Sequence, residues 1–560
     1  MRRLLVLLLL LFSTPNIFAY EKHPAAIASA KPLATEAGLQ ILQQGGNAFD
    51  AAITVSAVLA VVEPQSSGIG GGGFWLLHRQ NDGKQIMIDG REMAPGKSHR
   101  DMYLDQNGDV VPGLSLNGAL AAGIPGEIAA LVHIAEKYGN LSLSKTLAPA
   151  IKAAEEGFLV TERLQGMIKF RLEVLRSFPE SAKIFLENNE VPSLGYKIIQ
   201  KDLGATLRAV AEKGVAGFYQ GDVANKLISG VQAANGIWTF EDLKNYKVVE
   251  RKPVTGTYHG IKITSASPPS SGGIVIKQAL NILERTPLSS LSGITKKHVV
   301  IEAMRRAYQD RAIYLGDPDF VDIPKHITTK SYAGIKAGSI KNDQATPSEE
   351  LKRERSEGED TTHFSILDSE GNRVSATLSI NYPFGSGFIV PGTGVLLNDE
   401  MDDFSIRPGT PNAYGLIGDK ANEIVPYKRP LSSMSPTFLE SENKIAVVGT
   451  PGGSRIISMV LLAILDFAEE NSPESWVSLP RYHHQYMPDS ILFEPDTFSD
   501  QEKKELEKMG HKLKPRTRSY GNMQAILLDR KTGEIKAASD PRGEGSAQFT
   551  EINPTKSEQR

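Results

Sequence analysis

The stretch GEDTTHFSILDSEG, Gly358–Gly371, begins with charged residues and continues as a strand-like run. The preceding segment, TPSEELKRERSEGED (346–360), is charged and almost free of apolar side chains. After Asp360 come two threonines, a histidine and the strand-like run FSIL. The sequence therefore predicts a solvated linker that leads directly into a β-strand beginning at Thr361.

The residues that follow predict a β-hairpin. The run FSILD is followed by the turn signal SEGN (369–372) and by RVSATLSIN (373–381), in which apolar and polar residues alternate. This alternation predicts a half-buried second strand with a polar face. Pairing Asp368 with Arg373 places residue 380 opposite Thr361, and a shift of one residue would bring Ser379 or Asn381 there instead.

The position of Thr361 indicates a particular kind of nucleophile. A threonine hydroxyl attacks poorly until a base removes its proton, and the α-amine of an N-terminal threonine can be that base. This amine titrates near pH ~8, so it needs little tuning. A free amine on Thr361 requires cleavage of the Asp360–Thr361 bond, and an exposed linker is suited to such a cut.

Three further motifs suggest what this nucleophile attacks. Arg91 follows the predicted strand QIMIDG, and a guanidinium with the hydroxyls of Ser432 and Ser433 suits a carboxylate. The acids Glu400 and Asp403, with an asparagine, suit an ammonium group. A ligand with both charges beside an acyl carbon is an α-amino acid attacked at its side chain, and glutamate linked through its γ-carboxyl fits.

The third motif is Gly449–Arg455, GTPGGSR, which leads into the helical pattern SRIISMVLLAILDF. Backbone amides of Gly452 and Gly453 at such a helix start are suited to an oxyanion. A second glycine run, Gly68–Gly73, contains G-x-G-x-x-G, but it precedes a strand and opens no helix. It therefore predicts close backbone packing rather than a dinucleotide site.

Taken together, these motifs resemble those of the γ-glutamyltransferases, also called γ-glutamyltranspeptidases or glutathione hydrolases. The resemblance runs from about residue 21 to about residue 545. It rests on TTHFS, PQSSGIGGGGF, REMAP, PPSSGG, YLGDPDF, NDEMDDF, RPLSSMSPT and GTPGGSR. It implies an α+β fold, the αββα four-layer sandwich of the N-terminal-nucleophile (Ntn) hydrolases, made as one precursor that cuts itself into two subunits. Residues 20–360 would form the large subunit and residues 361–560 the small one.

The resemblance also implies a role for each site residue. Thr361 would be the nucleophile, and Gly452 and Gly453 the oxyanion hole. The substrate carboxylate would bind Arg91, Ser432 and Ser433, and its amine would bind Asn381, Glu400 and Asp403. Ser379 stands where the family commonly has threonine and keeps the hydroxyl that can bond to the nucleophile. The segment 408–428, with Tyr414, resembles the lid loop of some bacterial members.

The implied substrates are glutathione and other γ-glutamyl compounds, with water, amino acids or peptides as acceptors and no metal or organic cofactor. A cephalosporin (glutaryl) acylase shares this fold and mechanism, but its substrate lacks the α-amine that Asn381, Glu400 and Asp403 would hold. A secreted binding protein on an inactive scaffold is the third hypothesis, and an intact Thr361 and Gly452–Gly453 count against it.

The N-terminus and the composition predict an exported protein. Arg2 and Arg3 precede the apolar run Leu4–Phe12, which indicates a secretory signal peptide ending near Ala19 and a periplasmic or secreted location. The chain has no cysteine, so disulfides and thiol chemistry are excluded. A net charge of −3 over 560 residues predicts neither nucleic-acid binding nor stable membrane association.

Overall fold

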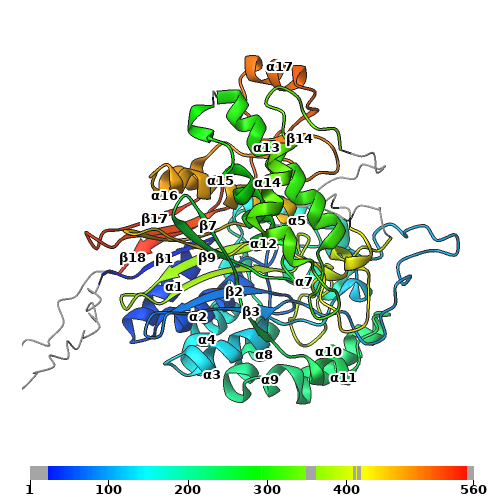
Figure 1. The fold of residues 1–560 in the computed structure, drawn as a ribbon. Coiled ribbons are helices and arrows are strands. Elements are labelled where there is room, and N and C mark those ends of the chain that lie inside the picture. The colour runs from blue at the N-terminus through cyan, green and yellow to red at the C-terminus, as the bar shows by residue number, and fades with distance from the viewer. Residues whose placement is uncertain are drawn as a thin grey trace, which may run out of the picture.

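The computed structural model describes residues 23–291, 293–348, 361–407, 412, 416 and 418–550. The predicted signal peptide, Asp360 and Tyr414 lie outside these residues. Figure 1 shows the strands in the middle of the molecule with helices on both sides. Among the described helices, none is long and apolar enough to cross a membrane.

Two stacked β-sheets form the inner layers. The first has seven strands in the order β18 (Ser546–Phe549), β1 (Ala26–Ser29), β9 (Thr362–Leu367), β10 (Arg373–Ser379), β2 (Gly72–Arg79), β3 (Lys84–Gly90) and β6 (Val249–Arg251). The second has six, in the order β17 (Ile535–Ser539), β16 (Gln524–Asp529), β12 (Lys444–Gly449), β11 (Thr437–Glu440), β8 (Ile261–Ser265) and β7 (Val254–Tyr258). β9 and β10 are central in the first sheet and contact β12 of the second.

Helices form the two outer layers and bury the outer face of each sheet. Against the seven-stranded sheet pack α1 (Pro32–Gln43), α2 (Ala48–Val62), α3 (Glu127–Tyr138) and α4 (Leu143–Glu156), with α8 (Lys201–Lys213) and α10 (Gly221–Ala233) behind them. On the other side lie α12 (Gly272–Leu283), α13 (Gly293–Tyr314), α14 (Lys330–Gly338), α15 (Ile456–Ala468) and α16 (Pro473–Ser478). This is the predicted αββα sandwich, which the structure confirms.

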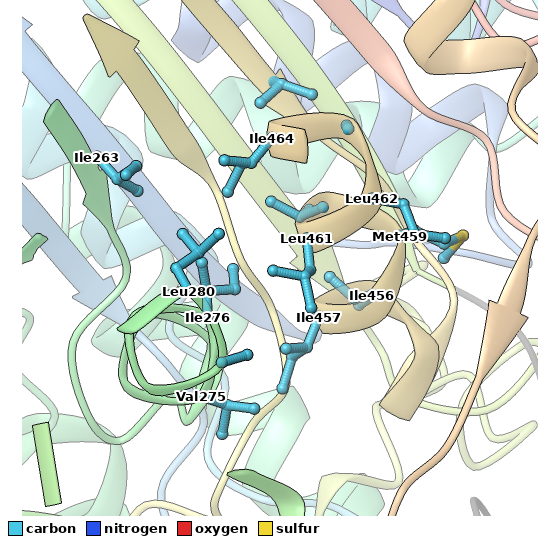
Figure 2. Packing of buried hydrophobic residues seen from close by; sticks show 14 of the residues in the cluster. Ile263, Val275, Ile276, Leu280, Ile456, Ile457, Met459, Leu461, Leu462 and Ile464 are labelled. Atoms are coloured by element: carbon cyan, nitrogen blue, oxygen red, sulfur yellow. The ribbon is translucent and has the colours of Figure 1, made fainter. Parts of the chain in front are cut away.

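The core beside the six-stranded sheet is built by α12 and α15. Figure 2 shows their aliphatic side chains filling the space between the two helices and reaching Ile263 of β8. Full burial of one such side chain stabilises the fold by about 1.5–3 kcal/mol. This packing fixes α15, and therefore also the Gly452–Gly453 turn just before it.

A third group of helices lies at one end of the sandwich. α5 (Glu162–Phe170), α6 (Leu172–Ser177) and α7 (Pro179–Phe185) form a small core of their own with Phe384 and Ile389. The remaining short helices are α9 (Ala216–Tyr219), α11 (Phe240–Asn245) and α17 (Asp500–Lys508). Short strands form two small additional sheets: β4 (Phe158–Leu159) with β5 (Lys197–Ile198), and β13 (Tyr482–His483), β14 (Ile491–Phe493) and β15 (Leu513–Pro515).

The β9–β10 hairpin forms as predicted, but its register differs by one residue. Arg373 pairs with Leu367 rather than with Asp368, so Ser379 and not residue 380 falls opposite Thr361. Asp368 belongs to the turn, where its carboxylate accepts hydrogen bonds from the backbone amides of Glu370 (3.0 Å) and Asn372 (2.9 Å). Such side-chain bonds are typical of turns that begin with aspartate.

The prediction of a half-buried β10 is wrong. Every residue of this strand is buried, because its polar face lies against the second sheet instead of water. There Ser375 donates to the carbonyl of Val448 (3.1 Å), and Ser365 of β9 donates to that of Gln524 (3.1 Å). The polar alternation therefore marks hydrogen bonds between the two sheets.

The glycine run that leads into β2 and includes its first two residues packs as predicted. A side chain on Gly71 would come within 2.2 Å of the Ser379 carbonyl oxygen, and one on Gly73 within 2.4 Å of the Thr377 carbonyl oxygen. Only glycine permits this approach of the chain to β10. The run thereby fixes the end of β10, which carries Ser379.

Candidate active site

Thr361 lies immediately before β9, on the side of the first sheet that faces the second. It is 5% exposed, and its Oγ1 lies 3.4 Å from Oγ of Ser379. The backbone amide of Asn381 donates to Ser379 Oγ (2.8 Å), which fixes this hydroxyl. Thr362 points the other way and donates to Glu63 Oε2 (2.6 Å). Of the two threonines, only Thr361 lines the cavity described below.

Arg91 follows β3, and its side chain is fully buried in a cluster of acids. Its Nη1 lies 2.6 Å from Glu400 Oε2 and its Nη2 lies 2.5 Å from Asp403 Oδ2. Glu92, the next residue in the chain, is 3.4 Å from Nη1. Burial alone would lower the pKa of Arg91, but Glu400 and Asp403 raise it above its ordinary value. The guanidinium is therefore charged at any physiological pH.

Burial acts on the acids in the opposite direction. It raises the pKa of Glu400 well above its ordinary value, although Arg91 opposes the shift, and it raises the pKa of Glu92 to about 7. Glu400 and Asp403 belong to the short 3-10 helix η4 (Glu400–Asp403). The side chain of Asn398 accepts from the amides of Glu400 and Gly123, both at 2.9 Å, and so holds η4 in place.

Asn381 lies between the nucleophile and the acids. Its φ of 76° is in the left-handed region, which asparagine tolerates better than most residues. Its Nδ2 donates to the Asp399 carbonyl (3.0 Å), so the residue links β10 to η4.

The hydroxyl oxygens of Ser432 and Ser433 each accept a hydrogen bond from a fixed donor. Ser432 Oγ accepts from the amide of Met434 (3.1 Å), and Ser433 Oγ accepts from Nη2 of Arg311 (3.2 Å). Each hydroxyl can then donate its own proton to a ligand oxygen. The backbone of Ser432 is bound by Ser271, so the PPSSGG segment supports the RPLSSMSPT segment.

Gly452 and Gly453 form the turn between β12 and α15, with η6 (Gly453–Arg455) at its end. Their φ values are 139° and 57°, in the region that favours glycine. No described residue accepts a hydrogen bond from either amide. Free N–H groups at a helix start are suited to bind an oxyanion.

One cavity brings most of the predicted residues together. It is lined by Arg91, Arg311, Thr361, Ser379, Asn381, Glu400, Asp403, Leu416, Ser432, Ser433 and Gly453, among others. Its free volume is about 20 Å³, room for one water, and the ion pair of Arg91 with Glu400 and Asp403 forms part of its wall. Gly452 lies on the far side of the same turn. Leu416 belongs to the predicted lid segment and lines the cavity.

Arg311 is a cavity residue that the sequence motifs do not indicate. It lies near the C-terminus of α13, is 4% exposed, and its Nε also donates to Ser271 Oγ (2.9 Å). Burial lowers the pKa of its guanidinium. Among the described residues, no carboxylate lies within ion-pair distance of it. The sequence carries no signal that separates Arg311 from the other buried charged residues of α13, among them Glu302, Arg305, Arg306 and Asp310.

The family follows from comparison with known proteins. A family model described as gamma-glutamyltranspeptidase matches residues 34–550. This chain belongs to the γ-glutamyltranspeptidase family. The glutathione hydrolase proenzyme of Escherichia coli K12 is 42% identical over 530 residues, which are 92% of this chain and 90% of that protein. That of Pseudomonas sp. strain A14 is 43% identical over 514 residues, 89% of each chain.

Solved structures agree with this family. A γ-glutamyltranspeptidase of Helicobacter pylori is 43% identical, with a TM-score of 0.56, over 58% of this chain and 94% of that chain. A cephalosporin acylase of Bacillus halodurans superposes more completely, with a TM-score of 0.82 over 96% of this chain and 99% of that chain, but it is 26% identical. Family members are enzymes, and the acylase shows how widely the fold is shared.

Proposed function

We propose that the protein cleaves glutathione and other γ-glutamyl amides and transfers the γ-glutamyl group to water or to an amine. The observation that carries this proposal is the pairing of Arg91 with Glu400 and Asp403 in the cavity of Thr361. A glutamyl zwitterion can enter this ion pair, its carboxylate replacing the acids at Arg91 and its ammonium replacing Arg91 at the acids. Every buried charge then keeps a partner of opposite sign. The free-energy cost of taking the substrate's charges out of water is therefore offset by these new ion pairs.

The proposed reaction begins with maturation. Thr361 Oγ1 attacks the carbonyl of residue 360, and water opens the resulting ester, which frees the α-amine of Thr361. Residues 20–360 and 361–560 then form a heterodimer. The terminal strands support this assembly: β1 of the large part lies between β9 and β18 of the small part, so the sheet holds both together after the cut.

In turnover, the α-amine of Thr361 takes the proton from Oγ1, which attacks the γ-carbonyl carbon. The amides of Gly452 and Gly453 bind the oxyanion, and the amine returns the proton to the leaving nitrogen. Water or an acceptor amine then attacks the ester and Oγ1 leaves with a proton. No step needs a metal or an organic cofactor. Residues 2–19 support export before maturation.

The acylase is the second candidate, because its fold superposes so completely. A glutaryl group has the carboxylate but not the ammonium. Its carboxylate would pair with Arg91 and displace Glu400 and Asp403, and these two acids would then have no cation as a partner. An unpaired buried charge costs about 2–5 kcal/mol. Retention of both acids therefore favours the γ-glutamyl substrate.

The two candidates are separated by the kcat/KM values for γ-glutamyl and glutaryl anilides. We expect the γ-glutamyl anilide to be preferred on the order of a hundredfold, the lower part of the range given by that energy. A preference for the glutaryl anilide would overturn the proposal.

A further inference from the structure

A basic cavity of about 470 Å³ lies at the free edge of β7, where the six-stranded sheet ends. Figure 1 shows α12 and α14 beside this strand. Among the described residues, the lining has three lysines and no acid. It consists of Thr255–Thr257 of β7, Lys262 of β8, Lys277 and Asn281 of α12, Thr328 of η3 (Lys325–Thr328) and Lys330 of α14.

Lys277 is the cation of this cavity that lacks a partner. Lys262 pairs with Glu440 (2.8 Å), and Lys330 pairs with Glu284. In the described part of the chain, no carboxylate lies within ion-pair distance of Lys277. Burial and the nearby Lys330 lower the pKa of the Lys277 amine. An anion in the cavity would oppose both effects.

The edge of β7 offers backbone groups to the same ligand. The Thr257 carbonyl points away from β8 and accepts from Lys330 Nζ (3.2 Å). The amide of Thr257 points the same way, because the two polar groups of a strand residue share one edge. Gly256 lets the side chain of Lys277 lie against the strand, since a Cβ there would come within 3.3 Å of Lys277 Cγ. The cavity is therefore suited to an anionic segment of extended chain.

The protein itself supplies such a segment. Cleavage before Thr361 makes Asp360 a C-terminus, and the five residues 356–360, SEGED, then carry four negative charges. Three come from the side chains of Glu357, Glu359 and Asp360, and the fourth is the new α-carboxylate. The charge of this end is complementary to that of the cavity.

The chain before this segment is fixed close enough for it to reach the cavity. Nη2 of Arg306 donates to Thr346 Oγ1 and to the Ser339 carbonyl, both at 3.0 Å, so Thr346 lies at the C-terminal end of α14. Lys330 begins this helix of nine residues, so the cavity lies on the order of 20 Å from Thr346. The residues 349–360 alone extend up to about 40 Å.

The exposed face of α14 lies between the two points. Ser331, Ile335 and Gly338 form this face. Ile335 is 73% exposed, the largest exposed fraction of any large apolar side chain among the described residues. Leu351, three positions after Ser348, is the one apolar residue of 349–360. It can cover Ile335, which lies one turn before the end of α14.

We propose that residues 349–360 dock along α14 after cleavage, with Leu351 on Ile335 and the acidic end in the cavity of Lys277. The partial positive charge at the N-terminus of α14 also favours this end. Docking gives Lys277 a partner and separates the new α-carboxylate of Asp360 from the α-amine of Thr361. This inference rests on the cut that belongs to the proposed function.

The first test is a carbodiimide, which joins a carboxylate to an amine only where the two are in contact. Trypsin cuts after Arg355, so residues 356–360 can be identified by mass spectrometry as a peptide linked to Lys277. We expect this cross-link in the mature protein and not in uncut Thr361→Ala, where the acidic end stays attached to residue 361. Ile335→Ser, at an exposed position, should lower the yield of the cross-link.

The second test is the rate at which acetic anhydride labels Lys277 in the mature protein. The double variant Glu357→Gln/Glu359→Gln should raise this rate about two- to fivefold, the size of an exposed ion pair. Glu349→Gln/Glu350→Gln is the matched control, because it removes the same charge from the other end of the segment and should leave the rate unchanged.

The outcomes separate this inference from the proposed function. A wild-type protein that stays a single chain would contradict the proposed maturation. A cut protein that forms no cross-link to Lys277, or forms one only to other lysines, would overturn the docking alone. So would a labelling rate that responds to inorganic phosphate but not to Glu357→Gln/Glu359→Gln, since the cavity would then bind a different anion.

Discussion

Arg311 and Arg91 are two buried guanidinium groups in one cavity with different surroundings. Arg91 is paired with three acids, whereas the guanidinium of Arg311 bonds, among the described residues, to the hydroxyls of Ser271 and Ser433 and to no acid. Arg91 could be found from the sequence because it follows a strand within a distinctive motif. Arg311 could not, because the motif residues that it meets lie in segments far from it along the chain.

We expect Arg311 to act as a positioning residue that holds Ser433 and adds positive charge near the substrate carboxylate. Arg311→Gln should raise KM for a γ-glutamyl anilide about tenfold or more with a smaller effect on kcat, since a hydrogen bond involving a charged group contributes about 1.5–3 kcal/mol. Arg311→Lys should restore part of the loss, because it keeps the charge but not the fork.

The control donor for Arg311 is 4-aminobutyryl anilide, which lacks the α-carboxylate. On this donor Arg311→Gln and wild type should react equally, since nothing remains for the serines to hold. A KM increase of the same size on both donors would show that Arg311 only supports the fold.

At the scale of the element, the hairpin of β9 and β10 was predictable in type and nearly in register. The one-residue error came from Asp368, whose side-chain bonds belong to the turn and leave no trace in the hydrophobic pattern. The predicted exposure of β10 was wrong for a different reason. A polar alternation shows that a face needs hydrogen bonds, but not whether water or a second sheet supplies them.

Thr361 and Thr362 have different roles, because neighbouring residues at the start of a strand point to opposite faces of the sheet. Thr362→Ala removes the bond to the buried Glu63 and should lower the free energy of unfolding by about 1–3 kcal/mol, the cost of an unsatisfied buried partner. Cleavage should still occur, because Thr361 is intact. The checks are a urea titration and a denaturing gel; a Thr362→Ala chain that folds but stays whole would assign the nucleophile to the wrong threonine.

At the scale of the whole molecule, Thr361 and the Gly452–Gly453 turn meet because the two sheets stack. Thr361 precedes β9 of the first sheet, and the turn follows β12 of the second. Pairing of β9 with β1 and β10, and of β12 with β11 and β16, brings Thr361 beside the glycine turn. The stacking of two sheets between two layers of helices was predicted from the resemblance to a known family. The strand patterns alone did not predict the order of these layers.

The space between the sheets also makes stability depend on pH. His363 is buried there, with Nδ1 2.8 Å from Thr377 Oγ1, and burial lowers its pKa to about 3. The unfolded chain, with an ordinary histidine pKa near ~6.5, binds the proton more tightly. The contribution of neutral His363 to stability is therefore complete above pH ~6.5 and falls as the pH drops toward about 3.

Urea titrations of wild type and His363→Gln between pH 7 and 4.5 test this linkage. The stability advantage of wild type should shrink by about 1.4 kcal/mol per pH unit below pH ~6, since a single proton is involved. An advantage that stays constant over this range would mean that His363 does not titrate between the folded and unfolded states.

The central claim is that Thr361 becomes an N-terminus and then carries the acyl group. Mass spectrometry of the purified protein, quenched in acid with a γ-glutamyl anilide, tests both at once. We predict two fragments, the smaller beginning Thr-Thr-His-Phe and bearing one γ-glutamyl group on residue 361, and a single unmodified chain for Thr361→Ala. A smaller fragment with another first residue, a γ-glutamyl group on another residue, or normal cleavage of Thr361→Ala would contradict the account.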